Sequence, residues 1–389
     1  MRRREAMRVG IVAAAQTRFR DYPEWRSHEL TYLAVEGVLK EAGLPFRDGY
    51  DEIVTCSSDH WEGKTLSDIE HGEVSGAHLG PGEVKVTQDG ANAVLLGYLK
   101  ILSGHARTVL VTACCKETQV LDPSVIENFA FDAPYQQLIG LDFTQAAALQ
   151  AMSYMSKYRI EREDLAEVVA REREAALANP LVPRADPITV DEILGSEVLS
   201  FPLTLHDRKP VCDGACALIL AHEERARELT DRPVWIKGIG SCYEPHNLGD
   251  RDLAEPRALI RAAGDAYRMA AISDPSKEID LFEVSEHYSY QLLLWMEGLG
   301  VCPSGRAVHL LRSGRTDRRG DLPVNPSGGL LAGVPRYVAG ANRVIEAFWQ
   351  LRGEAGERKV QGEPLLALAH GTCGPAGQHH CVIVLERGF

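Results

Sequence analysis

The chain has a deficit of positive charge and lacks the short signatures of common catalytic sites. Its 389 residues include 42 Lys plus Arg against 55 Asp plus Glu, a formal net charge of −13. This deficit argues against nucleic acid or an anionic membrane surface as the main partner. The sequence contains no H-E-x-x-H zinc motif, G-x-S-x-G nucleophile elbow, Walker A loop or G-x-G-x-x-G fingerprint. It therefore does not indicate the metalloprotease, serine-hydrolase, P-loop or dinucleotide-binding classes.

Disulfide and zinc signatures are also missing. The nine cysteines are odd in number, show no C-x-x-C spacing and have apolar or small neighbours, as at Cys114, Cys115 and Cys216. This pattern favours reduced, mostly buried thiols, so we expect no metal in this chain. No apolar run is long enough to span a bilayer, and no apolar segment follows the basic start as in a signal peptide. We expect a cytoplasmic protein without a membrane partner.

Strand-like and helix-like segments alternate along the chain, which indicates a sheet covered by helices on both faces. We expect strands at 8–15, 52–56, 108–113, 215–220, 234–240, 281–284, 364–369 and 381–385, and helices at 28–41, 91–102, 257–271, 290–299 and 338–351. The repeated order indicates two duplicated halves. Two further helices, at 146–159 and 163–179, interrupt the pattern together with Pro-rich turns. The predicted units are an N-terminal half (1–116 and 205–225), an inserted loop domain lying over the sheet (117–204) and a C-terminal half (233–389).

Four segments of the chain carry a family resemblance, namely Asp213–Ala217, Asn325–Leu331, Trp349–Glu354 and Ala367–Gly371. Together they resemble the thiolase superfamily, in particular its sterol-carrier-protein-type branch, and the resemblance covers nearly the whole chain. It implies an α/β protein of the five-layer αβαβα thiolase fold. It also implies a homodimer and acyl-CoA thioester substrates, with no covalently bound cofactor.

The chain departs from the thiolase pattern at the nucleophile. A thiolase uses a cysteine at the N-terminus of a buried helix, where the helix dipole stabilises the thiolate. Alignment on the segment that begins at Gly90 puts Thr87 at that position. The histidine that activates the cysteine is replaced by Val334, and Tyr337 stands where a glycine is usual. A covalent acyl-enzyme at Thr87 is therefore not expected.

Two further positions complete the comparison. Ser285 replaces the asparagine that holds a water of the oxyanion hole, and Tyr288 replaces a phenylalanine. Cys373 corresponds to the acid/base cysteine and is retained. The chain thus keeps the thiolase scaffold, lacks the nucleophilic cysteine and its histidine, and gains two phenols. In this combination it resembles the thiolase-like steroid side-chain-cleaving aldolases of actinobacterial sterol degradation. The resemblance implies retro-aldol cleavage of a β-hydroxyacyl-CoA, namely a 17-hydroxysteroid C-20 carboxyl-CoA, giving a 17-ketosteroid of the androstenedione type and propionyl-CoA.

Such a reaction needs a base for the β-hydroxyl, stabilisation of the enolate and an acid for its α-carbon, but no nucleophile. A phenol both donates and accepts hydrogen bonds, so Tyr288 and Tyr337 are the candidate acid/base pair, with Tyr288 as base. A phenol has an ordinary pKa of about 10, so a base of this kind needs a nearby cation or a hydrogen-bonded relay. His287 or Arg336 would supply it.

The remaining site predictions follow from the same resemblance. We expect His287 and Cys373 to join the tyrosines as catalytic groups, and the substrate to contact Ser285, Glu286, Asn325, Ser327, Gly328, Gly329, His370 and Thr87. The aldolase resemblance also implies a heterotetramer with a partner of OB fold and zinc ribbon, in which any zinc belongs to the partner. Structural roles compete with these catalytic ones. Both tyrosines could be core aromatics, and His287 could be a structural histidine. Two other functions stay open, an acyl-CoA acyltransferase with Cys373 as nucleophile and a non-catalytic acyl-CoA-binding or scaffold protein.

Overall fold

The sheet of the protein is built from two groups of strands with the same order and direction. The computed structural model describes residues 7–183 and 186–389. Its nine-stranded sheet has the order β3-β2-β4-β7-β1-β8-β11-β10-β9. The strands are β1 (Val9–Gln16), β2 (Glu52–Cys56), β3 (Gly82–Val86), β4 (Thr108–Lys116), β7 (Asp213–His222), β8 (Val234–Tyr243), β9 (Leu281–Glu283), β10 (Leu366–Cys373) and β11 (His379–Arg387).

The pairing shows the duplication directly. In the first group β2 is parallel to β3 and β4, and β4, β7 and β1 follow antiparallel. In the second group β9 is parallel to β10 and to a bridge at Val324, and β10, β11 and β8 follow antiparallel. Only a short antiparallel pairing of β1 with β8, at Gly10 and Ile11, joins the groups. The predicted duplicated halves are therefore confirmed, while the exact unit boundaries stay a prediction.

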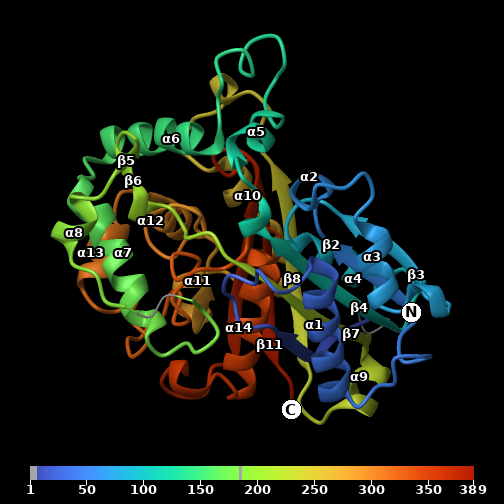
Figure 1. Cartoon of the computed structure of the whole chain (residues 1–389). Helices are drawn as coiled ribbons and strands as arrows, with labels where there is room; N and C mark the ends of the chain where they lie inside the picture. Colours follow the sequence, from blue (N-terminus) through green and yellow to red (C-terminus); the bar gives the residue numbers. More distant parts are fainter. Residues whose placement is uncertain (1–6, 184–185) are drawn as a thin grey trace.

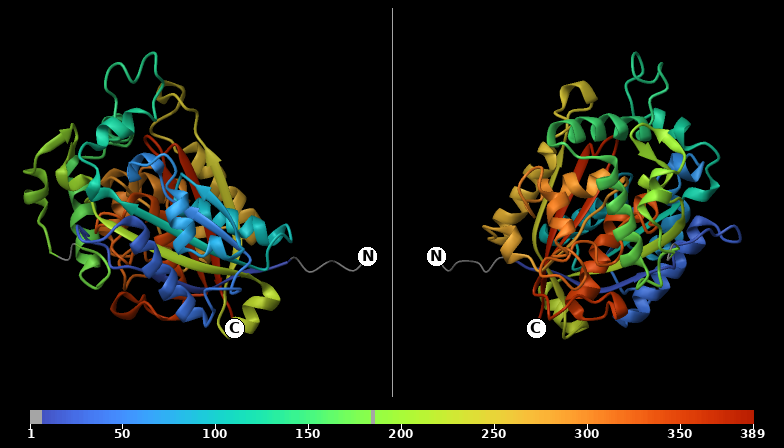
Figure 2. Two further views of the ribbon diagram at one scale, coloured as in Figure 1. Left: turned by 45° about the vertical axis from the view of Figure 1, so that its right-hand side comes forward. Right: turned by 90° about the vertical axis from the view of Figure 1, so that its left-hand side faces the viewer.

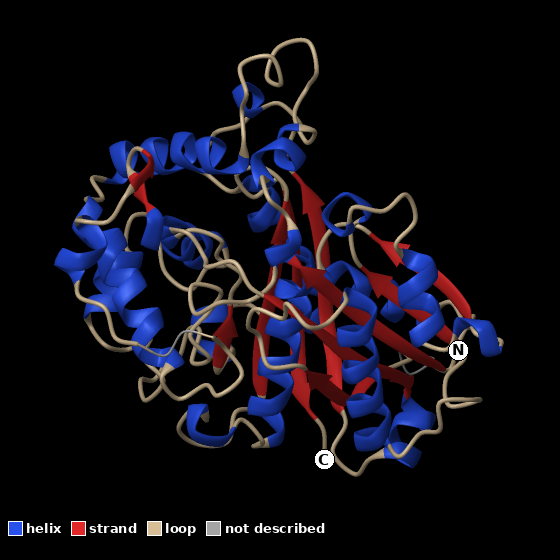
Figure 3. Ribbon diagram, viewed as in Figure 1, coloured by secondary structure: helices blue, strands red, loops and turns tan. Residues whose placement is uncertain are grey.

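Helices form three layers around the two groups of strands (Figures 1 and 3). The outer helix α1 (Ser27–Ala42) packs on β1, β4 and β7, and α10 (Arg257–Ala270) packs on β8 and β11. Between the groups, α4 (Gly90–Leu102) and α14 (Ala339–Arg352) contact each other and strands of both halves. The largest apolar core surrounds these two central helices. This is the expected five-layer αβαβα arrangement.

Close approach of α10 to β8 explains two glycines whose spacing resembles part of a nucleotide-binding loop. A Cβ on Gly238 would lie 2.2 Å from the carbonyl oxygen of Ala266, and one on Gly240 would lie 2.0 Å from that of Ala262. The inner face of α10 is correspondingly rich in buried alanine. These glycines therefore serve helix–strand packing.

The loop domain packs on a helix of the C-terminal half, and its predicted position over the sheet stays a prediction. It contains α5 (Pro123–Asn128), α6 (Phe143–Tyr158), α7 (Arg162–Ala176), α8 (Val190–Leu194), β5 (Val198–Ser200) and β6 (Leu203–Thr204). Helices α6 and α7 contact α12 (Ser289–Gly298) and share one apolar core with it; Figure 2 shows this side of the molecule. Because α12 is buried on nearly all sides, it needs a cover on the face turned away from the sheet.

The other differences concern weakly patterned segments. Strand β3 was not predicted, because it lies at the sheet edge and carries alternating charges at Glu83 and Lys85. The polar segment after β7, for which no element was predicted, forms a helix, α9 (Glu223–Leu229), of which only Ala226 is buried. The short helices α2 (Asp59–Glu62), α3 (Asp68–Val74), α11 (Pro275–Glu278) and α13 (Ala307–Arg312) were also missed. All of them bury too few residues for a clear periodicity.

Candidate active site

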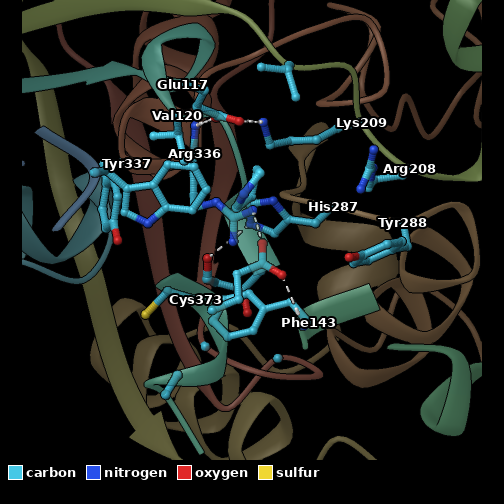
Figure 4. Close-up of a pocket in the computed structure, with 18 of the residues that line it drawn as sticks. Glu117, Val120, Phe143, Arg208, Lys209, His287, Tyr288, Arg336, Tyr337 and Cys373 are labelled. Atoms are coloured by element: carbon cyan, nitrogen blue, oxygen red, sulfur yellow. Dashed lines mark hydrogen bonds and ion pairs between the residues drawn. The ribbon is translucent and has the colours of Figure 1, made fainter. Parts of the chain in front are cut away.

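A cavity of about 610 Å³ lies where several elements of both halves begin or end. Its wall includes Thr87 and Gln88 before α4, Tyr337 before α14, Tyr288 before α12 and Cys373 at the end of β10. A cavity of this volume is within the range of small-molecule sites. Of the residues predicted for the site, Tyr288, Tyr337, His287, Cys373 and Thr87 line this cavity (Figure 4). Their individual roles stay predictions.

Tyr288 is held from two sides. Its side chain is 6% exposed, its hydroxyl lies 3.1 Å from the Thr144 hydroxyl of α6, and its backbone forms an antiparallel bridge with Arg208. Burial raises the pKa of this phenol, as does the Glu127 carboxylate, whereas Arg336 acts in the opposite direction. The phenol is therefore neutral at neutral pH, and the Thr144 hydroxyl is its hydrogen-bond partner.

Tyr337 lies in the turn that leads into α14. Burial raises the pKa of its phenol, and a hydrogen bond with Ser58 and the charge of Arg336 counteract part of this shift. In Figure 4, Tyr288 and Tyr337 stand on opposite sides of the cavity with Arg336 and His287 between them. Both phenols are thus neutral groups that share one neighbouring cation.

That cation, Arg336, is fixed by carboxylates and aromatic rings. Its guanidinium donates to Glu127 at 2.7 Å and its backbone N–H donates to Glu117. The guanidinium carbon lies 4.6 Å from the centre of the Trp61 ring and 5.2 Å from that of Phe143, a cation–π geometry. Burial opposes the charge of Arg336, but Glu127 and Glu117 outweigh it and hold the pKa above its ordinary value.

His287 does not supply the positive charge that a phenolic base needs. Burial, Arg336 and Lys209 lower its pKa well below the ordinary value, so the imidazole is neutral. Its Nε2 lies 3.4 Å from the carbonyl oxygen of Thr372. A carbonyl only accepts, so this contact assigns the ring proton to Nε2 and leaves Nδ1 as an acceptor. Of the two candidates for the cation, Arg336 is the charged one.

Cys373 is paired with a histidine that the sequence did not indicate. Its Sγ lies 3.7 Å from Nδ1 of His379, whose Nε2 lies 2.8 Å from the Ser241 hydroxyl. Burial and the nearby Asp89 raise the pKa of the Cys373 thiol. Burial lowers the pKa of His379 to about 4. At neutral pH the pair is a thiol beside a neutral imidazole, a proton donor more than a nucleophile.

A second ion pair in the cavity wall was also missed. Lys209 Nζ lies 2.7 and 3.0 Å from the two carboxylate oxygens of Glu117, and its backbone N–H donates to the His287 carbonyl at 2.9 Å. Glu117 therefore links Lys209 to Arg336 and holds the segments around His287 and Tyr337 together. Its place directly after the buried strand β4 was the one available signal, because polar groups of α/β sites gather at strand ends.

The other residues predicted to bind substrate are buried and do not line the cavity. Glu286 accepts hydrogen bonds from the Asn325 side chain and from the backbone of Leu330 and Leu331. This holds the turn at Asn325–Leu331, in which Gly328 and Gly329 have positive φ and Ser327 donates to Glu283. The backbone N–H of Ser285 donates to Nδ1 of the His370 side chain at 3.4 Å. In the structure these residues are therefore part of the buried interior, and their part in substrate binding stays a prediction.

Residues 7–183 and 186–389 contain neither a metal-binding cluster nor a membrane-spanning helix. No group of three or more His, Cys, Asp or Glu side chains is arranged to hold a metal ion. Within the same residues, none of the helices combines the length and apolar character that a bilayer span requires. The nine cysteines are all free, and Cys114 and Cys115 are 1% exposed.

Known proteins resemble large parts of the chain. Residues 241–387 match the family described as thiolase C-terminal domain-like. The acetyl-CoA acetyltransferase of Methanothermobacter thermautotrophicus is 31% identical over 382 residues, which cover 95% of this chain and 98% of that protein. The chain belongs to the thiolase superfamily. The benzoylsuccinyl-CoA thiolase subunit BbsB of Thauera aromatica is 28% identical over 60% of this chain and 61% of its own length.

Solved structures give the same fold for this thiolase-superfamily protein. An Ltp2–ChsH2(DUF35) aldolase superposes with a TM-score of 0.83 at 23% identity, covering 97% of both chains. Human mitochondrial 3-ketoacyl-CoA thiolase superposes with a TM-score of 0.73 at 17% identity, covering 98% of this chain and 99% of the other. The predicted thiolase fold is therefore confirmed. The acetyltransferase and the two thiolases among these proteins are named for CoA-linked substrates, and the fourth is named an aldolase.

Proposed function

We propose that this thiolase-superfamily protein is a carbon–carbon lyase that cleaves a β-hydroxyacyl-CoA by a retro-aldol reaction without an acyl-enzyme. The observation that carries the proposal is the chemistry of the cavity wall. Thr87 and Gln88 precede α4 where a thiolase needs its cysteine, while two neutral phenols, Tyr288 and Tyr337, face the same cavity. Proton transfer is available there, and a thiolate nucleophile at the start of α4 is not.

The steps balance when one proton leaves to solvent and one returns from it. Tyr288 accepts the proton of the β-hydroxyl as its own proton passes to the Thr144 hydroxyl, 3.1 Å away, and the hydroxyl proton of Thr144 passes to solvent. The O–H electron pair forms the new carbonyl, the Cα–Cβ bond breaks, and its electron pair passes into the thioester enolate. Tyr337 or the Cys373 thiol then donates a proton to the α-carbon and regains one from solvent. Arg336 stabilises the negative charge that develops between the two phenols.

The substrate we propose is a 17-hydroxysteroid C-20 carboxyl-CoA, which would yield a 17-ketosteroid and propionyl-CoA. The cavity of about 610 Å³ and its apolar lining by Trp61, Val120, Phe143 and Val211 suit a bulky ring system. The solved structure titled an Ltp2–ChsH2(DUF35) aldolase has the same fold and supports the reaction class by analogy.

We also propose a homodimer that binds a second protein of OB fold and zinc ribbon next to the cavity. Val120, Pro123, Glu127 and Ala130 line the cavity from the segment between β4 and α6. The same segment exposes large apolar side chains, namely Leu121 at 102%, Phe129 at 65%, Tyr135 at 77%, Leu138 at 79% and Ile139 at 76%. A cluster of this kind is typical of a protein–protein contact.

The deciding experiment is mass spectrometry of products and enzyme. The protein, alone and co-expressed with the partner, is incubated with the 17-hydroxysteroid thioester and with simpler β-hydroxyacyl-CoA thioesters. We expect equal amounts of ketone and shortened acyl-CoA, with the protein mass unchanged during turnover. Binding of the thioester without product, with the partner present, would instead indicate a non-catalytic acyl-CoA-binding protein.

An acyltransferase is the second candidate, because Cys373 lies beside His379 and because the relative in M. thermautotrophicus is named an acetyl-CoA acetyltransferase. In this reaction the Cys373 sulfur would take the acyl group and release CoA. Incubation with acetyl-CoA would then add one acetyl group to the peptide that contains Cys373. Detection of that adduct at a rate matching turnover would replace the lyase proposal.

A further inference from the structure

Asp89 is a fully buried carboxylate placed between the N-termini of the two central helices. Its Oδ1 accepts the backbone N–H of Ala91 in the first turn of α4 at 2.9 Å, and its Oδ2 accepts that of Gly340 in the first turn of α14 at 3.0 Å. Its exposed fraction is 0%. One carboxylate thus takes up the N–H groups that two helices direct toward the cavity end of the protein.

Three glycines make room for this arrangement. A Cβ on Gly340 would lie 1.8 Å from Asp89 Oδ1, and one on Gly371 would lie 2.2 Å from the same atom. A Cβ on Gly90 would lie 2.5 Å from that of Ala341, so no larger residue fits where the two helices meet. The carboxylate is therefore enclosed on the sides of α4, α14 and β10, and Gly371 stands two residues before Cys373.

Several elements of the fold place ionisable groups near Cys373. The imidazole of His379 on β11 is its hydrogen-bond partner at 3.7 Å. Tyr243 at the end of β8, Tyr337 before α14 and the thiols of Cys56 and Cys381 are its other electrostatic neighbours. Lys209 and Arg336 line the same cavity but are paired with Glu117 and Glu127. Asp89 is the carboxylate that acts on the Cys373 sulfur.

We propose that Asp89 is a positioning residue that occupies the anion-binding point formed by α4 and α14 and so keeps Cys373 a thiol. Without this carboxylate, the two helix N-termini would favour a thiolate close to them. With it, their N–H groups are already bonded and a negative charge stands in their place. Burial raises the pKa of Asp89 to about 7, so the carboxylate is charged throughout the alkaline range in which a thiol ionises.

The inference explains the proposed chemistry without an acyl-enzyme, but its test uses no substrate and can fail independently. Iodoacetamide alkylates a thiolate: the sulfur bonds to the CH₂ group, iodide leaves and the thiol proton goes to solvent. The alkylation rate of the peptide containing Cys373 is measured by mass spectrometry between pH 6 and 11 in the wild type and in Asp89→Asn. Asn keeps the shape and one acceptor of the cap and removes the charge.

We expect the midpoint of the Cys373 profile to fall by about one pH unit in Asp89→Asn, so that alkylation below the midpoint is about tenfold faster. Asp89→Ser, which is also uncharged, gives a second variant if Asn disturbs folding. Asp142→Asn at the half-buried N-cap of α6 is the matched control. An unchanged midpoint in folded Asp89→Asn and Asp89→Ser, or an equal fall in Asp142→Asn, would overturn the proposal.

Discussion

Oδ2 of Asp89 lies 3.0 Å from the backbone nitrogen of Gly340, although 251 positions separate the two residues in the chain. The contact joins α4 of the first half to α14 of the second at their N-terminal ends. Each helix directly follows a segment that lines the cavity, Thr87–Gln88 in one case and Arg336–Tyr337 in the other. The geometry of the cavity therefore depends on how closely these two helix ends approach.

Replacing Gly340 by alanine should destabilise the protein. The added Cβ would lie 1.8 Å from Asp89 Oδ1 and 2.7 Å from the Cβ of Ala91, and both neighbours are buried. Such overpacking costs about 1–3 kcal/mol, and displacement of a buried carboxylate adds to it. Chemical denaturation should show at least about 2 kcal/mol lost for Gly340→Ala.

Gly264→Ala is the matched control for this substitution. Gly264 is an exposed position inside α10, and a Cβ there would meet no atom within 4 Å. Alanine is favoured over glycine in a helix interior by about 0.8–1.0 kcal/mol. We expect Gly264→Ala to be neutral or stabilising, and a Gly340→Ala variant as stable as this control would refute the packing argument.

Loss of either cavity phenol should abolish most of the activity while the fold persists. Tyr288→Phe and Tyr337→Phe remove only a hydroxyl each, and general acid or base catalysis contributes about 10²–10⁴-fold. We expect kcat to fall by about that factor in each variant, measured by release of shortened acyl-CoA. Tyr32→Phe, at a 44% exposed position of α1, should retain wild-type kcat. Unchanged kcat in both cavity variants would rule out phenolic acid/base catalysis.

The sequence sufficed for the regular layers and for part of the site. Strand β4 is buried throughout and α4 over most of its length, so their apolar residues predict both elements, although β4 continues to Lys116, past the predicted end at 113. Tyr288 and Tyr337 were found through the family resemblance, because nothing local distinguishes them from core aromatics. The pairing of Lys209 with Glu117 could not be predicted, since the partners are 92 positions apart and no sequence pattern records a contact made only by the tertiary fold.

Cys373 separates the two enzymatic proposals. If the protein is a lyase, Cys373→Ala removes at most a proton donor that Tyr337 can replace, and we expect kcat to fall by less than about tenfold. If Cys373 is a nucleophile, the same change should leave almost no turnover. The assay is product release from the same β-hydroxyacyl-CoA, with thermal unfolding as the folding control. A complete loss of activity in a folded Cys373→Ala variant would contradict the lyase mechanism.

The ionisation of Asp89 should be visible in the pH dependence of stability. Its pKa is about 7 in the folded protein because of burial, against about 3.9 in an unfolded chain. Between these values the unfolded chain binds fewer protons than the folded one, so Asp89 lowers stability as the pH rises.

The Asn side chain of the Asp89→Asn variant does not ionise. The unfolding free energy of the wild type relative to Asp89→Asn should therefore fall by about 3 kcal/mol between pH 4 and pH 7. Urea denaturation at intervals across this range measures the difference, with Asp142→Asn as a control for loss of a half-buried N-cap carboxylate. A flat difference for Asp89→Asn would mean that the carboxyl group is ionised in the folded protein at acid pH, and that two helix N-termini stabilise its charge more strongly than burial opposes it.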